Sequence, residues 1–335
     1  MKRLIGRVSA LATALFMGAG AYAGEITAYT SLEEDDVRVY LDEFTKSHPD
    51  IQVNVLRLST GDLGARMLAE SSNPQHDIIW GWAVTQMADP RILEMIEPYK
   101  PAGIDEVKTE FKDPDNHWFA TTGYFAAFCV NNPVLEQHGL PMPTSWEDLL
   151  NPVYKGHIVV PNPASSGTGY LQIASILQMK GEEEGWKFLE ALDANIAQYI
   201  KSGSKPCRAA AAGEYAIGAS FAFSAVKLIL EGYPITLVVP SEGAGYEMEV
   251  SGLMKTSDNK EDTQKFLDWL LTPAAAKLYG ERSEISVVPG AKATEAVLNA
   301  GLPEDVSSVL YKMDFNWSAQ NKERILEEWT RRIER

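Results

Sequence analysis

A run of hydroxyl and small residues at 161–170 (PNPASSGTGY) has the composition of an oxyanion-binding loop. It follows a short β-branched segment and precedes apolar residues at helical spacing, so residues 165–169 are expected at the entry to a helix. The first amides of a helix lack partners within it and carry partial positive charge, and glycines let a ligand approach them. The candidate anion donors are Ser165, Ser166, Gly167 and Thr168.

Two other interpretations of this loop were weighed. A single Ser or Thr at this point is equally expected of an ordinary helix cap, but five small or hydroxyl residues in a row favour a bound oxyanion. The pair Gly167 and Gly169 resembles part of a dinucleotide fingerprint, yet Gln172 occupies the third glycine position and no G-x-x-x-x-G-K-[ST] occurs. We therefore set nucleotide binding aside.

Further candidates follow predicted strands at 24–30, 51–58 and 77–80. Strands that alternate with helices predict a parallel sheet with right-handed crossovers, and ligands bind at the carboxyl edge of such sheets. Acidic residues at 33–36 equally suit the first turn of a helix, and tryptophan usually packs in a core. The candidate ligand residues of these loops are Ser31, Glu33, Thr60 and Trp82.

The second half of the chain is predicted to repeat the α/β pattern. An apolar extended run at 118–132 is long enough to carry the chain from one lobe to another, and 252–254 are expected to return it. A strand at 216–221 and a glycine-flanked loop at 241–245 are expected to reach the cleft. The candidates from these segments are Tyr124, Phe221 and Glu242, with core packing as the alternative for the two aromatic residues.

A hydrolase was tested as a different class of function. Residues 218–222 (GASFA) fall one residue short of the G-x-S-x-G elbow, with Ser220 as the nucleophile. An α/β-hydrolase places its histidine after the serine, yet no histidine follows His157. A binding protein therefore fits better than an enzyme, and no cofactor is expected.

The N-terminus is typical of a secretory signal, with a basic start, an apolar stretch at 8–19 and the small-residue site 21–23 (AYA). Cleavage after residue 23 removes three positive charges and takes the net charge from −16 to −19. Such acidity argues against nucleic acid or an anionic membrane as partner. It does not exclude an anionic ligand, because local donors set the field inside a cleft.

The two cysteines, Cys129 and Cys207, would lie in a compartment that permits oxidation. The sequence is compatible both with a disulfide between them and with two buried thiols. The five histidines are scattered singly and no CxxC or HExxH occurs, so no metal site is expected.

Together these segments resemble the periplasmic solute-binding proteins of ABC importers, in the branch that contains the ferric-ion-binding proteins. Within that branch the chain is most similar to 2-aminoethylphosphonate-binding proteins. The resemblance covers the whole chain after the signal. The segments that carry it are 29–33 (YTSLE), 59–61 (STG), 73–81 (NPQHDIIWG), 144–149 (TSWEDL) and 163–170 (PASSGTGY).

The resemblance implies a two-lobed α/β fold of type II with a hinge of two crossover strands. It also implies closure on a ligand and docking of the monomer on a membrane permease in the periplasm. The expected parts are a signal peptide at 1–23, an N-terminal lobe at 24–122 plus 250–300, a C-terminal lobe at 123–249, and C-terminal helices at 301–335 on the C-terminal lobe.

In ferric-binding relatives an S-G-S/T loop holds an anion, which supports the loop at Ser166. Those relatives hold iron through a histidine or acid after the first strand and a Tyr-Tyr pair. Here the first loop lacks histidine, and the segment matching the pair reads Phe221-Ala222-Phe223. Since phenylalanine cannot ligate iron, an organic anion is favoured.

The expected ligand, 2-aminoethylphosphonate, has a phosphonate of about −1.5 to −2 charges, by analogy with phosphate esters, and an ammonium two carbons away. Donors for the phosphonate are expected from the loop at 165–168, with Ser31 and Thr60. The expected ammonium partner is Glu33, then Glu242, with aromatic walls from Trp82, Tyr124 and Phe221. A sugar phosphate, inorganic phosphate and ferric ion are the alternatives.

Overall fold

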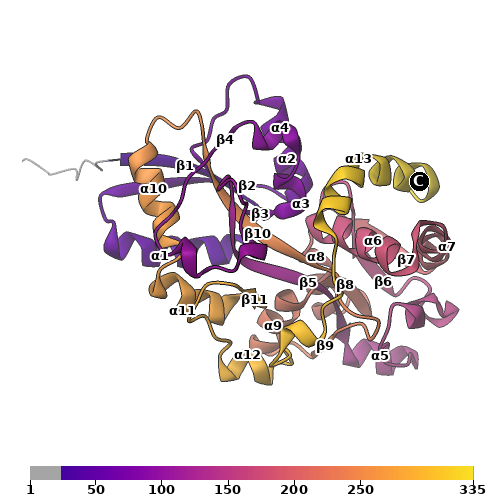
Figure 1. Ribbon diagram of the computed structural model, residues 1–335. Coiled ribbons are helices and arrows are strands. Elements are labelled where there is room, and N and C mark those ends of the chain that lie inside the picture. The colour runs from indigo at the N-terminus through magenta and orange to yellow at the C-terminus, as the bar shows by residue number, and fades with distance from the viewer. Residues whose placement is uncertain (1–23, 335) are drawn as a thin grey trace, which may run out of the picture.

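The computed structural model describes residues 24–334 and arranges them as two α/β lobes joined by long strands (Figure 1). The strands follow one another in the order β2-β1-β3-β10-β5-β8-β6-β7, so a single hydrogen-bonded path runs through both lobes. The predicted two-lobed α/β class is confirmed. The predicted signal peptide at 1–23 lies outside the described residues.

The first lobe is built on parallel strands β1 (Gly24–Thr30), β2 (Ile51–Arg57) and β3 (Ile78–Ala83). Helices α1 (Glu34–Ser47) and α2 (Thr60–Ala69) connect them. The first turn of α1 is acidic, which complements the helix dipole, and its buried Val37, Tyr40 and Phe44 lie on one face. Each of these helices therefore begins at the carboxyl edge of the sheet.

Strand β3 is longer than predicted. We expected the strand to end at Trp80 and Trp82 to stand beyond it, but β3 continues to Ala83. Its extension pairs with β10, where Val250 lies opposite Trp82. A partner strand from the far end of the sequence stabilises this segment, which explains why local pattern alone missed it.

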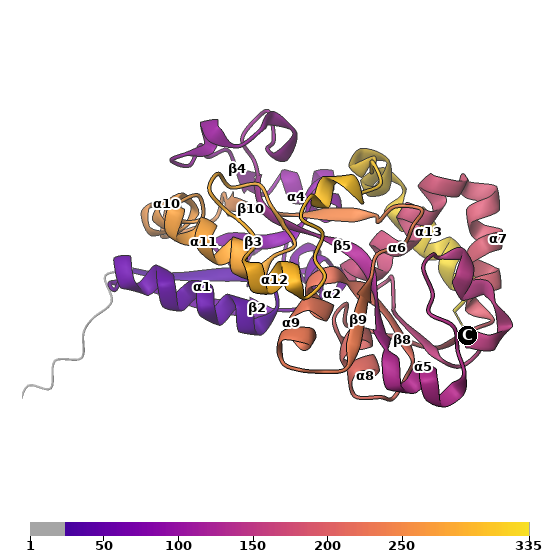
Figure 2. The same cartoon turned by 90° about the horizontal axis from the view of Figure 1, so that it is seen from below.

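Two strands cross between the lobes, β5 (Phe119–Asn131) and β10 (Tyr246–Met254). The first half of β5 pairs with β10, and its second half pairs with β8 and β9 of the second lobe. Figure 2 shows β5 passing from one lobe into the other. The crossovers were predicted at 118–132 and 252–254, and the second of these strands begins earlier than predicted, at Tyr246.

The second lobe surrounds parallel strands β6, β7 and β8 with helices. Its helix α6 is buried along most of its length, and Ser166 caps it by accepting the Gly169 amide at 3.3 Å. The elements of this lobe are α5 (Asn132–His138), β6 (Ile158–Pro161), α6 (Gly167–Lys180), α7 (Glu182–Asp193), β7 (Ile196–Ile200), α8 (Lys205–Ala211), β8 (Ile217–Phe221), α9 (Ala222–Leu230) and β9 (Ile235–Val238).

The remaining elements pack against both lobes: Phe266 and Ala275 lie in the core of the first lobe, and Ile325 and Trp329 in the core of the second. Among the described helices, none is both long and apolar enough to cross a membrane. These elements are α3 (Val84–Met87), α4 (Pro90–Leu93), β4 (Ile96–Glu97), α10 (Lys260–Trp269), α11 (Pro273–Arg282), β11 (Ile285–Ser286), α12 (Glu295–Asn299), α13 (Phe315–Arg332) and 3-10 turns at Ile104–Glu106, Thr109–Phe111, Glu147–Leu150, Pro152–Tyr154 and Val306–Ser308.

The final helix, α13, contacts both lobes. Its Ser318 carbonyl accepts the Tyr170 hydroxyl at 2.5 Å, which fastens the helix to α6 of the second lobe. On the other side Glu323 pairs with Arg91 of α4 at 2.7 Å. The C-terminal helix thus begins beside α3 of the first lobe and runs along α6 of the second (Figure 1).

A disulfide joins Cys129 of β5 to Cys207 of α8, with a Cα–Cα distance of 5.2 Å. Both residues are fully buried. Cys129 lies in the half of β5 that pairs with β8 of the second lobe. The bond therefore fixes α8, and the loop before it, to the sheet of that lobe.

Candidate functional site

The N-termini of α2 and α6 meet in the cleft between the lobes. The Gly61 amide of α2 donates to the Ser165 carbonyl before α6 at 2.9 Å, a direct backbone contact between lobes. A Cβ built on Gly167 would lie 2.7 Å from Thr60 Oγ1 and 2.7 Å from Tyr124 Oη. Two positive helix ends and two hydroxyls from different elements therefore converge at the start of α6.

Several donors at this point have no hydrogen-bond partner among residues 24–334. Within residues 24–334, no hydrogen bond engages the amides of Gly167 and Thr168 or the hydroxyls of Thr60, Tyr124 and Thr168. Thr60 and Thr168 are nonetheless buried. Because amides at a helix N-terminus carry partial positive charge, this set is suited to a ligand that supplies acceptor oxygens.

A third loop closes the same space. A Cβ on Gly203 would lie 2.5 Å from Thr168 Oγ1 and 3.1 Å from Ser166 Oγ. Ser220, considered above as a nucleophile, donates its hydroxyl to the Gly203 carbonyl at 2.7 Å and so holds this loop. We call the region the anion pocket, formed by Thr60, Tyr124, Ser166, Gly167, Thr168 and Gly203.

Most of the predicted site residues line one cavity that contains the anion pocket. They come from both lobes and from the hinge strand β5. The predicted residues on its wall are Ser31, Glu33, Thr60, Tyr124, Ser166, Gly167, Thr168 and Phe221.

Three predicted residues lie outside the cavity wall. Ser165 donates its hydroxyl to the Lys201 carbonyl at 3.0 Å. Trp82 is buried, and its Nε1 donates to the Thr60 carbonyl at 3.1 Å, so it supports the start of α2 from behind. Glu242 accepts the Glu147 amide at 3.1 Å on an exposed loop.

Glu33 reaches the cavity but is already paired. Its Oε1 accepts from Arg57 at 3.2 Å and its Oε2 from Arg208 of the second lobe at 3.2 Å. Both carboxylate oxygens therefore face guanidinium groups, and one of these pairs connects the two lobes.

We predict that Glu33→Gln weakens ligand binding by no more than about fivefold. The pair with Arg208 is solvent-accessible, and exposed ion pairs contribute about 0 to 1 kcal/mol. Calorimetry on Glu33→Gln, Arg208→Gln and the double variant checks this, because the double variant should lose no more than either single one. A loss of a hundredfold for Glu33→Gln would show that the carboxylate touches the ligand.

The cavity is also lined by a second group of charged residues, which sequence reasoning missed. Asp36 of α1 lies 2.5 Å from Lys227 of α9 and 2.7 Å from Arg282 of α11. Burial raises the pKa of Asp36, and its two cationic neighbours oppose that shift. The Asp36 and Lys227 pair joins the lobes, as Glu33 and Arg208 do.

Two glutamates on the hinge side complete the wall. Glu249 accepts the Thr122 hydroxyl at 2.5 Å, and Glu284 accepts the Phe125 amide at 3.3 Å. Burial raises the pKa of Glu249 to about 7 and that of Glu284 to about 8. The signal that could have identified Glu249 was the pair of acidic residues at alternating positions of a crossover strand, 247 and 249.

From the raised pKa values of these acids we predict that the ligand-free protein loses stability as the pH rises from 6.5 to 7.5. Burial raises the pKa of Glu247 to about 7 as well, so the native acids retain protons that the unfolded chain has released. The free energy of unfolding should fall by about 1 to 2 kcal/mol over this range. Burial lowers the pKa of His76 to about 4, so its smaller opposing effect falls mostly below this range.

Urea unfolding at each pH measures this slope. Glu284→Gln should flatten it, because that variant has one acid fewer to ionise. A free energy that stays constant or rises across the same interval would contradict the predicted burial of ionisable acids.

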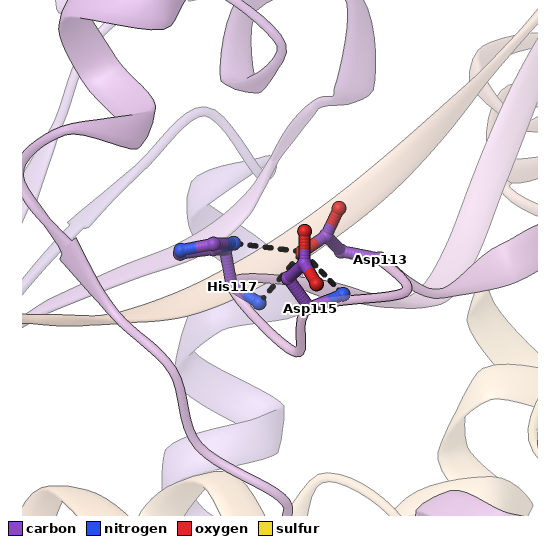
Figure 3. Close-up of side chains that lie close together, drawn as sticks. All are labelled: Asp113, Asp115 and His117. Atoms are coloured by element: carbon purple, nitrogen blue, oxygen red, sulfur yellow. Dashed lines mark hydrogen bonds and ion pairs between the residues drawn. The ribbon is translucent and has the colours of Figure 1, made fainter.

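One cluster of metal-ligating residue types lies elsewhere, in the turn before β5 (Figure 3). Asp113 Oδ2 accepts the amides of Asp115 at 3.1 Å and His117 at 3.0 Å, and it lies 2.8 Å from His117 Nδ1. These contacts form the turn itself. The cluster shares no residue with the cavity between the lobes.

Two lobes, a strand hinge and a cleft lined from both sides define a solute-binding protein. Residues 90–315 match the family described as bacterial extracellular solute-binding protein, and the chain belongs to that family. Members of the family act outside the cytoplasm as the binding components of ABC transporters.

Two relatives and one solved structure are similar to this chain over most of its length. An uncharacterized protein of Haemophilus influenzae is 30% identical over 293 residues, covering 85% of this chain and 84% of that protein. The Fe(3+)-binding periplasmic protein of Serratia marcescens is 24% identical over 282 residues, covering 79% and 80%. The solved periplasmic binding protein AfuA of Actinobacillus pleuropneumoniae, with exogenous fructose 6-phosphate bound, is 27% identical with a TM-score of 0.85, covering 93% and 99%.

Proposed function

We propose that this protein captures 2-aminoethylphosphonate in the periplasm and delivers it, as a monomer, to an ABC permease. The observation that carries the proposal is the anion pocket, where donors that have no partner within the described part of the chain converge from both lobes. A ligand that bridges the lobes stabilises the closed state by its differential affinity for that state. Closure is then the signal that a permease reads.

The anion pocket suits a phosphonate. A tetrahedral oxyanion of about −1.5 to −2 charges needs several fixed donors, and hydrogen bonds to charged groups are about twice as strong as neutral ones. Amides at the start of α6 and the hydroxyls of Thr60, Tyr124 and Thr168 supply them. Ser31 lines the same cavity, but its hydroxyl donates to the Gly81 carbonyl at 3.2 Å.

The cavity is poorly suited to ferric ion at the position where the resemblance to ferric-ion-binding proteins implies a pair of tyrosines. Phe221 and Phe223 line the cavity there, and a phenyl ring offers no ligand atom. Hard cations prefer oxygen ligands arranged around one point. The acids of this cavity instead pair with Arg57, Arg208, Lys227 and Arg282 or lie apart from them on the hinge side.

A sugar phosphate is the second candidate. It is favoured by AfuA, which was solved with fructose 6-phosphate and shares 27% of its sequence with this chain. In that case the anion pocket would hold the phosphate, and the cavity carboxylates would accept hydrogen bonds from sugar hydroxyls.

A thermal-shift panel, followed by calorimetry, tests the proposal. The probes are 2-aminoethylphosphonate, inorganic phosphate, fructose 6-phosphate and ferric citrate. We expect 2-aminoethylphosphonate to raise the melting temperature most, since a ligand at a hundred times its Kd stabilises by about 2.7 kcal/mol. A larger shift with fructose 6-phosphate would favour the second candidate, and a shift only with ferric citrate would reject both.

A further inference from the structure

Two acids of the cavity differ from the others in having no cationic partner. Among residues 24–334, neither Glu249 nor Glu284 forms a salt bridge, whereas Glu33 and Asp36 are each paired with two basic side chains. Glu249 accepts the Thr122 hydroxyl, and Glu284 accepts the Phe125 amide. Burial raises the pKa of Glu284, and further backbone amides, of Glu284 itself and of Phe223, lower it. Buried acids usually have a cation or several hydrogen bonds, so this pair has capacity for a further partner.

The two acids lie on the hinge beside the anion pocket. Glu249 of β10 is opposite Thr122 of β5, and Glu284 directly precedes β11, whose Ile285 is opposite Gly123. The next residue of β5, Tyr124, reaches the start of α6 with its hydroxyl. Burial raises the pKa of Tyr124, and the negative charges of Glu247, Glu249 and Glu284 raise it further. One short stretch of β5 therefore connects the anion pocket to the acids.

We propose that Glu249, with Glu284 beside it, binds the ammonium group of the ligand while the anion pocket holds its phosphonate. This inference rests on the proposed function and assigns the half of the site that sets selectivity. A ligand with opposite charges at its two ends then matches donors at one end of the cavity and carboxylates at the other. Such a site discriminates against anions that lack the amine, because their binding leaves the buried acids without a partner.

The assignment also makes binding depend on pH. Burial holds the pKa of these acids near 7 and 8, so they are largely protonated below neutral pH. An ammonium favours the ionised carboxylates, so affinity for 2-aminoethylphosphonate should rise from pH 6 to pH 8 with release of protons. The charged and titratable groups around Glu249 are Glu33, Asp36 and Tyr40 of the α1 region, Tyr124 of β5, Lys227 of α9, Tyr279 and Arg282 of α11, and Glu284.

Two ligands that differ only in the amine distinguish the contribution of each end of the site to affinity. Calorimetry at pH 7.5 compares 2-aminoethylphosphonate with ethylphosphonate, which has the same anion and no amine. Glu249→Gln should lose about a hundredfold or more in affinity for the aminophosphonate and change by less than threefold for ethylphosphonate, which also shows that the variant is folded. Glu284→Gln should act in the same direction, and Glu242→Gln, a carboxylate outside the cavity, should leave both affinities unchanged.

The outcomes of these measurements distinguish a failure of the ammonium site from a failure of the proposed function. If Glu249→Gln and Glu284→Gln both bind 2-aminoethylphosphonate within threefold of the unaltered protein, the ammonium site is elsewhere and this inference is overturned while the proposed function stands. The inference also fails alone if the unaltered protein binds the two phosphonates equally well. If the unaltered protein binds neither phosphonate, the proposed function and the inference are both wrong.

Discussion

Gly167→Ala is expected to abolish capture of the ligand, with affinity for 2-aminoethylphosphonate reduced by at least about a hundredfold. The added methyl group would lie 2.7 Å from both Thr60 Oγ1 and Tyr124 Oη, within the volume assigned to the phosphonate. It would displace two hydroxyls, each of whose bonds to a charged group contributes about 1.5 to 3 kcal/mol. It would also press the lobes apart, because Thr60 belongs to the first lobe and Gly167 to the second.

Calorimetry and small-angle scattering measure this effect. A matched control is Gly64→Ala, in the same helix as Thr60, where the added Cβ meets Gln86 and Trp82 at 3.1 Å and not the cavity. The control should bind the ligand and compact on binding as the unaltered protein does. If Gly167→Ala still binds within tenfold and still compacts, the phosphonate does not occupy the anion pocket.

The second large effect is expected from removing the disulfide. Cys129 and Cys207 are 78 residues apart, so the bond closes a long loop in the unfolded chain. A loop of this length implies stabilisation of about 4 kcal/mol in the chain-entropy account. The double variant Cys129→Ala and Cys207→Ala should lose about that much free energy of unfolding.

The loss has a specific consequence for the site. The bond fixes α8, and the loop before α8 places Gly203 against Ser166 and Thr168. Affinity should therefore decrease along with stability, and a reducing agent should have both effects on the unaltered protein and neither on the double variant. Urea unfolding that shows a change below 1 kcal/mol would contradict this role for the bond.

The class of fold could be predicted because its signals are local. Alternation of β-branched runs with amphipathic segments is written in the residues themselves, and parallel strands with crossovers follow from that order. The crossover strand β5 was predicted from one long, mainly apolar run. The predicted end of β3 was wrong because the last residues of this strand are stabilised by β10, about 170 residues away in the sequence.

The anion pocket could be predicted for a similar reason. A helix N-terminus with glycines and hydroxyls is recognisable in the sequence, and the structure places Ser166, Gly167 and Thr168 on the cavity wall. Ser165 could not be separated from them, because the choice of the Lys201 carbonyl as its partner depends on the fold of a later segment.

The carboxylate side of the site could not be predicted. Glu33 was favoured because it follows a strand end, but the two arginines that engage it lie 24 and 175 residues away. Glu249 and Glu284 have no motif around them, and they become distinctive only when hinge strands bury them beside β5. Burial and pairing over such separations are properties of the folded chain.

A crystal structure of the protein grown with 2-aminoethylphosphonate tests the central claim most directly. We predict a phosphonate oxygen within hydrogen-bonding distance of Thr60 Oγ1 and another at the amide of Thr168, with the lobes closed around them. A ligand bound at any other place, with the start of α6 facing only solvent, would contradict the account.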